Sequence, residues 1–138
     1  MVGAHPVSEV SHFMHTSTVI VVGHTQCDGA RACLEAVQSA STLPAPDTPL
    51  TRWLAPLAQL ITTLDLASTP TSTHLDAVVD ANVELQVKNL CESDVIKATW
   101  AAYANNKEEK KPVLVHGWVY EVATGRIKDL GITRGPSV

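Results

Sequence analysis

The sequence predicts an α/β protein with a mostly parallel β-sheet flanked by helices. The first observation is the run Val19-Ile20-Val21-Val22, ended by Gly23, which is typical of a strand buried on both faces in the middle of a parallel sheet. The second is an apolar helical stripe directly after it, formed by Ala30, Cys33, Leu34 and Val37. The third is a β-rich segment near the carboxyl end. Alternating strands and helices of this kind indicate the α/β class.

Composition limits the size and the function class. With 138 residues, 45% of them hydrophobic, the chain is expected to form a single domain over residues 1–138. The net charge is −4, and the ten Lys and Arg residues are scattered, so the sequence predicts no face for nucleic acid or for an anionic membrane. No apolar run approaches the ~20 residues of a membrane span, and the start lacks a signal-peptide pattern. A soluble, cytoplasmic protein is therefore expected.

The three cysteines favour metal binding or free thiols over a disulfide framework, because their number is odd and no signal peptide is apparent. Cys33 and Cys91 lie on apolar helical stripes, where a cysteine behaves as a small hydrophobic residue. Both are expected in the core.

His24 and Cys27 fall in the turn between the carboxyl end of the strand and the amino end of the helix, where open α/β sheets bind ligands. Imidazole and thiolate both suit zinc, and the helix amino terminus favours the thiolate. Asp28 is placed to cap the first turn of the helix. The alternative is a turn histidine beside a buried apolar cysteine.

The rest of the chain predicts helices and a hairpin. Ser39 to Thr51 is a proline-rich linker, followed by a helix over 52–61 with Pro56 in its first turn and Trp53 on its apolar stripe. A helical stripe runs from Asp76 to Cys91, and another helix starts at Ser93. The final segment is a hairpin over 113–130 that turns at Thr124-Gly125. The first 17 residues could supply two helical turns beside the strand.

Four separated motifs in this order resemble the β-class carbonic anhydrases, over Val19 to Leu130. They are V-V-G-H-x-x-C at 21–27, W-L-x-P at 53–56, N-V-x-x-Q-V-x-N-L at 82–90 and V-H-G-W-V-Y at 115–120. The resemblance implies that His24 and Cys27 hold a zinc ion (Zn²⁺). It also implies a reversible hydration of carbon dioxide to bicarbonate, in which a metal-bound hydroxide is the nucleophile.

The family's C-x-D-x-R motif, which supplies its first zinc cysteine and an Asp-Arg pair, does not occur ahead of His24. The resemblance therefore implies a shortened chain whose amino-terminal strands are missing. A third ligand would come from Asp28, from another subunit, from solvent, or from one of His5, His12 and His15. Asp28 could instead accept a hydrogen bond from the metal-bound water. His116 is interpreted as a packed histidine.

Three interpretations follow from the resemblance. The first is a carbonic anhydrase of reduced activity. The second is a non-catalytic homologue that acts as a structural or regulatory oligomerisation partner, and the third is a truncated form of a normal enzyme. Because so little sheet is available to cover the helices, a homodimer or a larger even-numbered oligomer is expected.

Overall fold

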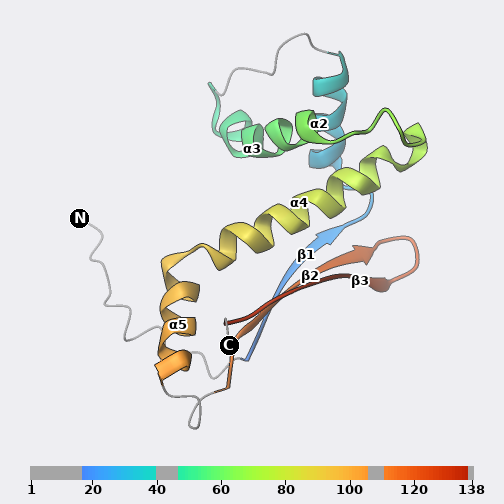
Figure 1. Ribbon diagram of the computed structural model, residues 1–138. Helices are drawn as coiled ribbons and strands as arrows, with labels where there is room; N and C mark the ends of the chain where they lie inside the picture. The colour runs from blue at the N-terminus through green and yellow to red at the C-terminus, as the bar shows by residue number, and fades with distance from the viewer. Residues whose placement is uncertain (1–16, 40–46, 106–110, 137–138) are drawn as a thin grey trace.

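The computed structural model describes residues 17–39, 47–105 and 111–136. It confirms the predicted α/β class (Figure 1). The elements in chain order are β1 (Thr18–His24), α2 (Asp28–Ser39), α3 (Pro49–Thr63), the short 3-10 helix η1 (Thr71–Thr73), α4 (His74–Cys91), α5 (Asp94–Asn105), β2 (Leu114–Glu121) and β3 (Arg126–Arg134). The predicted helical turns before Ser17 lie outside the described residues.

The described sheet is mixed and has the strand order β1-β2-β3. β1 pairs with β2 in parallel, from Thr18 opposite Leu114 to His24 opposite Tyr120. β2 and β3 form the predicted antiparallel hairpin, in which Gly125 takes a φ of 71° at the turn. The register of the hairpin shifts between Gly117 and Trp118, where β3 carries a bulge.

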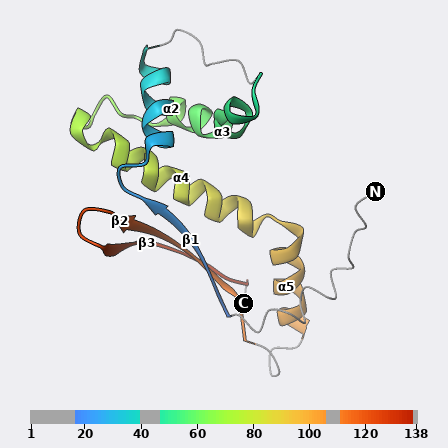
Figure 2. The same ribbon diagram turned by 180° about the vertical axis from the view of Figure 1, so that it is seen from behind.

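The prediction that β1 is buried on both faces is wrong for the described sheet. Val19 and Val21 pack against the core, whereas Ile20 and Val22 on the opposite face are exposed. The reason is that the described helices all lie on one side of the sheet, as both ribbon views show (Figures 1 and 2). A run of β-branched residues predicts a strand but does not reveal which of its faces is covered.

Helix α4 crosses the inner face of the sheet and carries the centre of the core. As the stripe predicts, Val79, Val83 and Val87 are buried, together with Val78. They meet Val115 and Val119 of β2, which point to the same side. Two glycines allow this approach. A Cβ on Gly23 would lie 2.6 Å from Val83 Cγ2, and one on Gly117 would lie 3.1 Å from Val83 Cγ1.

Helices α2 and α3 pack against each other and against α4, on the side away from the sheet (Figure 2). The predicted stripe of α2 is confirmed, since Ala30, Cys33 and Leu34 are buried. Helix α3 starts at Pro49, earlier than predicted, because Thr48 and Thr51 form a capping box and proline suits the first helical position. Pro56 therefore lies inside the helix, not in its first turn, and Trp53 is 75% exposed instead of buried.

Helix α5 begins after Ser93, whose Oγ accepts a hydrogen bond from the Ile96 amide at 3.5 Å. The polar residues of α4 pair with one another: Gln86 Nε2 donates to Asn82 Oδ1, and Asn89 Nδ2 donates to Gln86 Oε1. Among the described residues, none of the helices is both long enough and apolar enough to cross a membrane.

Replacing Gly23 by alanine should destabilise the fold. The new Cβ would collide with Val83, and overpacking of this kind costs about 1–3 kcal/mol. Urea denaturation should show the loss as a lower midpoint. Gly29→Ala is the matched control, because its Cβ would have only Cys27 Sγ at 4.0 Å and the residue lies in a helix, where alanine is preferred. Equal urea midpoints for the two variants would show that the close packing of α4 against Gly23 does not contribute to stability.

Candidate metal centre

The turn between β1 and α2 carries the predicted ligands and is tied to the end of β2. The Thr25 amide donates to the carbonyl of Tyr120 at 2.9 Å, and Thr25 Oγ1 accepts from the amide of Val122 at 3.0 Å. Gln26 has a φ of 59°, the left-handed conformation that reverses the chain before the helix. Two long-range hydrogen bonds and one left-handed residue therefore fix where His24 and Cys27 lie.

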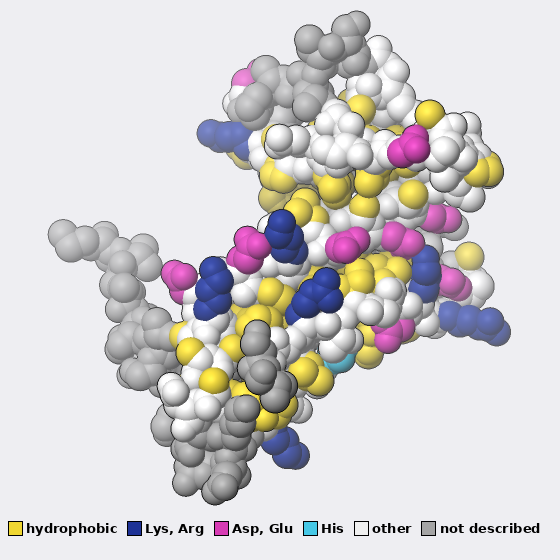
Figure 3. All heavy atoms as spheres, viewed as in Figure 1, with side chains coloured by type: hydrophobic (Ala, Val, Ile, Leu, Met, Phe, Trp, Pro, Cys, Tyr) yellow, Lys and Arg dark blue, Asp and Glu magenta, His cyan; other side chains and the backbone are white. Residues whose placement is uncertain are grey.

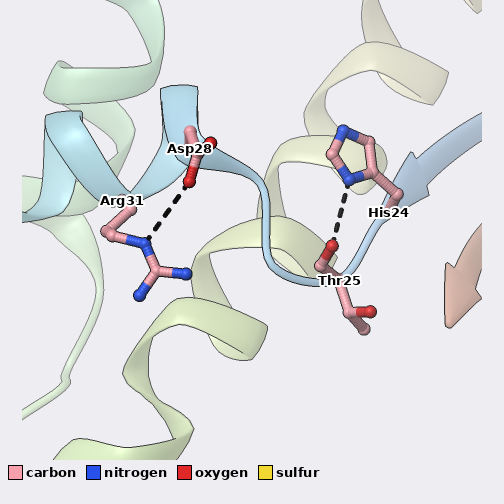
Figure 4. A network of polar contacts seen from close by, with 4 residues as sticks. All are labelled: His24, Thr25, Asp28 and Arg31. Atoms are coloured by element: carbon pink, nitrogen blue, oxygen red, sulfur yellow. Dashed lines mark hydrogen bonds and ion pairs between the residues drawn. The ribbon is translucent and has the colours of Figure 1, made fainter. Parts of the chain in front are cut away.

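His24 ends β1 and lies on the exposed side of the strand, together with Ile20 and Val22. Its Nδ1 lies 3.0 Å from the carbonyl oxygen of Thr25 (Figure 4). Because a carbonyl oxygen can only accept, Nδ1 is the donor in this contact, and in the neutral form of the ring Nε2 then keeps its lone pair. A hydrogen bond from one ring nitrogen to a carbonyl is the usual arrangement for a histidine that binds metal through the other. This tautomer therefore suits a metal ligand.

Cys27 is half-buried and packs against the core just before α2. Its carbonyl accepts the first hydrogen bond of the helix, from the Arg31 amide at 2.9 Å.

The thiols of Cys33 and Cys91 both have a raised pKa. Burial is the main cause that raises the pKa of Cys33, and electrostatic repulsion from nearby Cys27 adds to it. Burial also raises the pKa of Cys91, although Arg134 opposes that shift. Cys33 is buried as predicted, and Cys91 packs half-buried at the core margin.

Asp28 is the first residue of α2, and its side chain is almost fully exposed. One carboxylate oxygen lies 3.7 Å from Nε of Arg31, one turn along the helix. No backbone amide of the described residues donates to this carboxylate, so the predicted cap does not form, although a negative charge in the first turn still favours the helix. Figure 4 shows the turn backbone passing between His24 and the Asp28–Arg31 pair.

The described residues contain no group of three or more His, Cys, Asp or Glu side chains that could hold a metal ion. The turn therefore offers two donors of the right chemistry, whereas a catalytic zinc commonly has three protein ligands. His5, His12 and His15 lie outside the described residues. His116 is not near the turn: it lies opposite Ile20, and its Nδ1 is 2.9 Å from Thr133 Oγ1. Its ring packs beside Trp118, as predicted.

Thr25 is the residue of this region that the sequence does not single out. Its two hydrogen bonds reach residues of β2 and of the hairpin turn that are almost a hundred positions away, so no local sequence pattern predicts them.

A hollow of about 80 Å³ lies beside Thr25, between α4 and the hairpin, and its polar lining includes Asp76, Asp80 and Lys128. Lys128 Nζ and Asp80 Oδ2 form an ion pair at 2.7 Å there. Neither His24 nor Cys27 lines it.

Charged side chains of both signs are spread over the face of the molecule seen in Figure 3. Figure 3 shows Lys and Arg side chains interspersed with Asp and Glu along α4 and the sheet, with apolar side chains in the hollow between α4 and the α2–α3 layer. On this face the two signs of charge alternate, so no extended positive field forms over it.

The family model and the solved structures that match this chain agree on one protein family. A family model described as carbonic anhydrase matches residues 10–127. Among solved structures, a β-carbonic anhydrase of Coccomyxa in complex with acetazolamide has a TM-score of 0.70 and 25% identity, over 93% of this chain and 53% of that one. A tetrameric β-carbonic anhydrase of Sordaria macrospora has a TM-score of 0.67 and 24% identity, over 93% and 59%.

A β-carbonic anhydrase of Aspergillus fumigatus has a TM-score of 0.66 and 24% identity, over 91% of this chain and 53% of its own. The chain thus spans little more than half the length of these solved proteins. The family model nevertheless covers most of this chain, including the β1–α2 turn, helices α2 to α5 and most of the hairpin. The chain therefore belongs to the carbonic anhydrase family and has the fold of its β class.

Proposed function

We propose that this chain binds zinc through Nε2 of His24 and Sγ of Cys27 and catalyses the reversible hydration of carbon dioxide to bicarbonate, at reduced activity. The observation that supports this most directly is the hydrogen bond from His24 Nδ1 to the Thr25 carbonyl, which leaves Nε2 available for a metal. Cys27 follows on the same short turn, at the amino end of a helix that favours a thiolate.

Each part of the turn has a task in this proposal. A zinc ion there would supply Lewis-acid activation of a water molecule at neutral pH. The Thr25 hydrogen bonds to Tyr120 and Val122 hold the turn rigid, so that the two donors keep their places. Asp28 accepts a hydrogen bond from the reacting water. The third ligand comes from solvent, from another subunit, or from a histidine outside the described residues.

A second candidate is a non-catalytic family member that acts as a structural or regulatory partner in an oligomer. The observation that favours it is the lack of a three-donor group among the described residues. In both cases we propose a homodimer or a larger even-numbered assembly. The related enzymes of Sordaria macrospora are described as tetrameric.

Zinc content distinguishes the two candidates. Freshly purified protein should carry stoichiometric zinc by elemental analysis, and His24→Ala and Cys27→Ser should each lose most of it, because each removes one of two ligands. Matched controls are His116→Ala and Cys91→Ser, which change the same residue types away from the turn and should keep the metal. A zinc-free wild type with an intact circular dichroism spectrum would support the non-catalytic candidate.

Asp28→Asn should lower the rate of carbon dioxide hydration by about tenfold or more while zinc content stays unchanged, since the amide is a poorer acceptor for the reacting water. Stopped-flow measurement with a pH indicator gives the rate. If Asp28 only supports its helix, the variant should instead lose a few tenths of a kcal/mol of stability, about the value of one first-turn charge, at an unchanged rate.

Alkylation should single out Cys27. In metal-free protein at pH 8, iodoacetamide should label Cys27 before Cys33 and Cys91, because the raised pKa of both other thiols lowers their thiolate fraction. Added zinc should slow labelling of Cys27 alone, and peptide mass spectrometry can follow each site. Labelling of Cys27 that zinc does not change would speak against Cys27 as a ligand.

A further inference from the structure

Asp28 and Gly29 form the only Asp-Gly pair in the sequence, and no asparagine is followed by glycine. In such a pair the backbone nitrogen of the second residue can attack the side-chain carboxyl group of the first, which closes a five-membered ring. Glycine hinders this attack least, because it has no Cβ and its backbone is the most flexible. The pair is therefore the position in this chain that is chemically most prone to rearrange.

The carboxyl group of Asp28 is free to turn toward the next residue. Its side chain is 99% exposed, and within the described residues its charged partner is Arg31, whose Nε lies 3.7 Å away (Figure 4). The Arg31 side chain is itself 48% exposed, so the attraction between the two charges is weak in water. Rotation of the Asp28 side chain therefore breaks only a weak contact.

The backbone nitrogen of Gly29 is also available. The first hydrogen bond of α2 joins the Arg31 amide to the Cys27 carbonyl at 2.9 Å, so the Gly29 amide lies in the first turn, where N–H groups have no acceptor within the helix. A Cβ built on Gly29 would meet only Cys27 Sγ, at 4.0 Å, so the space around this residue is open. Helix ends also open at little cost, which gives Asp28 the non-helical conformations that ring closure needs.

We propose that Asp28 is a site of spontaneous isomerisation to isoaspartate. The Gly29 nitrogen attacks Cγ of the protonated carboxyl group, an N–Cγ bond forms, and the carboxyl hydroxyl leaves with the amide hydrogen as water. The product is a cyclic succinimide. A water molecule then attacks the backbone carbonyl of residue 28 and breaks its bond to the Gly29 nitrogen, so that the chain continues through the former side chain. One water leaves and one returns, and the reaction needs no oxidant.

Isomerisation would detach the start of α2 from the turn that carries Cys27. The main chain gains one carbon atom between Cys27 and Gly29, and the hydrogen bond from the Arg31 amide to the Cys27 carbonyl spans this point. That hydrogen bond should be lost, and Cys27 should shift relative to its contacts with the core. An effect on zinc rests on the proposed function, in which Cys27 is a ligand, whereas the isomerisation itself needs no metal.

Peptide mapping of stored protein tests the site. Metal-free protein is kept at pH 7.4 and 37 °C, and electron-transfer fragmentation locates isoaspartate at each position. Asp94 is the internal reference, because it is also exposed and also the first residue of a helix, α5, but is followed by Val95. Isoaspartate should accumulate at residue 28 at least about fivefold faster than at Asp94, since a valine side chain hinders ring closure. Equal rates at the two positions would overturn the proposal.

Two variants test the chemistry at this pair. Gly29→Ala should slow isoaspartate formation at residue 28 at least about fivefold, because the new Cβ hinders ring closure while the open space around it leaves the helix intact. Asp28→Asn is the positive control. Its neutral side-chain amide is attacked more readily than an ionised carboxyl group, so it should convert faster, with loss of ammonia. An unchanged rate in Gly29→Ala would count against ring closure and overturn the proposal.

The same measurement in guanidinium chloride shows whether the folded helix protects the pair. The folded protein should form isoaspartate within about tenfold of the rate of the unfolded chain, because only the end of α2 has to open. Isoaspartate confined to the unfolded chain would mean that the first turn of α2 stays closed, and the proposal would be wrong. All samples are metal-free, so a failure of zinc binding would leave these rates unchanged and is seen separately, in zinc content.

Discussion

Val83 of α4 lies against two glycines on neighbouring strands, Gly23 of β1 and Gly117 of β2, and the described architecture is arranged around this close approach. A side chain at Gly23 would collide with Val83, and one at Gly117 would lie in tight contact with it. With the helix seated, Val79 and Val87 reach the inner faces of β1 and β2 and complete the core. The α2–α3 layer then packs on the other side of α4, so its position also depends on this contact.

The same contact positions the candidate metal centre. Gly23 directly precedes His24, so the packing of α4 against Gly23 fixes the position of the carboxyl end of β1. The Thr25 hydrogen bonds to Tyr120 and Val122 then anchor the turn that follows. His24 then projects on the exposed side of the strand, and Cys27 packs on the core side of the turn. His24 is thus held by the sheet and Cys27 by its contacts with the core just before α2, and the turn joins them.

Within the described residues, the sheet exposes an apolar face, and β1 is its edge strand. The face exposes Ile20, Val22 and Ile127, and the edge belongs to β1. These surfaces differ physically: the face gains from burial of any apolar surface, whereas the edge requires a strand in matching register.

The sequence by itself determined the elements whose signal is local. These include the strand at Val19–Val22, the stripes of α2 and α4, the turn at Gly125 and the place of His24 and Cys27 between strand and helix, because side-chain periodicity and turn chemistry act over a few residues. Tertiary structure decided the rest. The exposure of Ile20, Val22 and Trp53 and the Thr25 anchor depend on which surfaces meet, and neighbours brought together by the fold are not encoded in a local pattern.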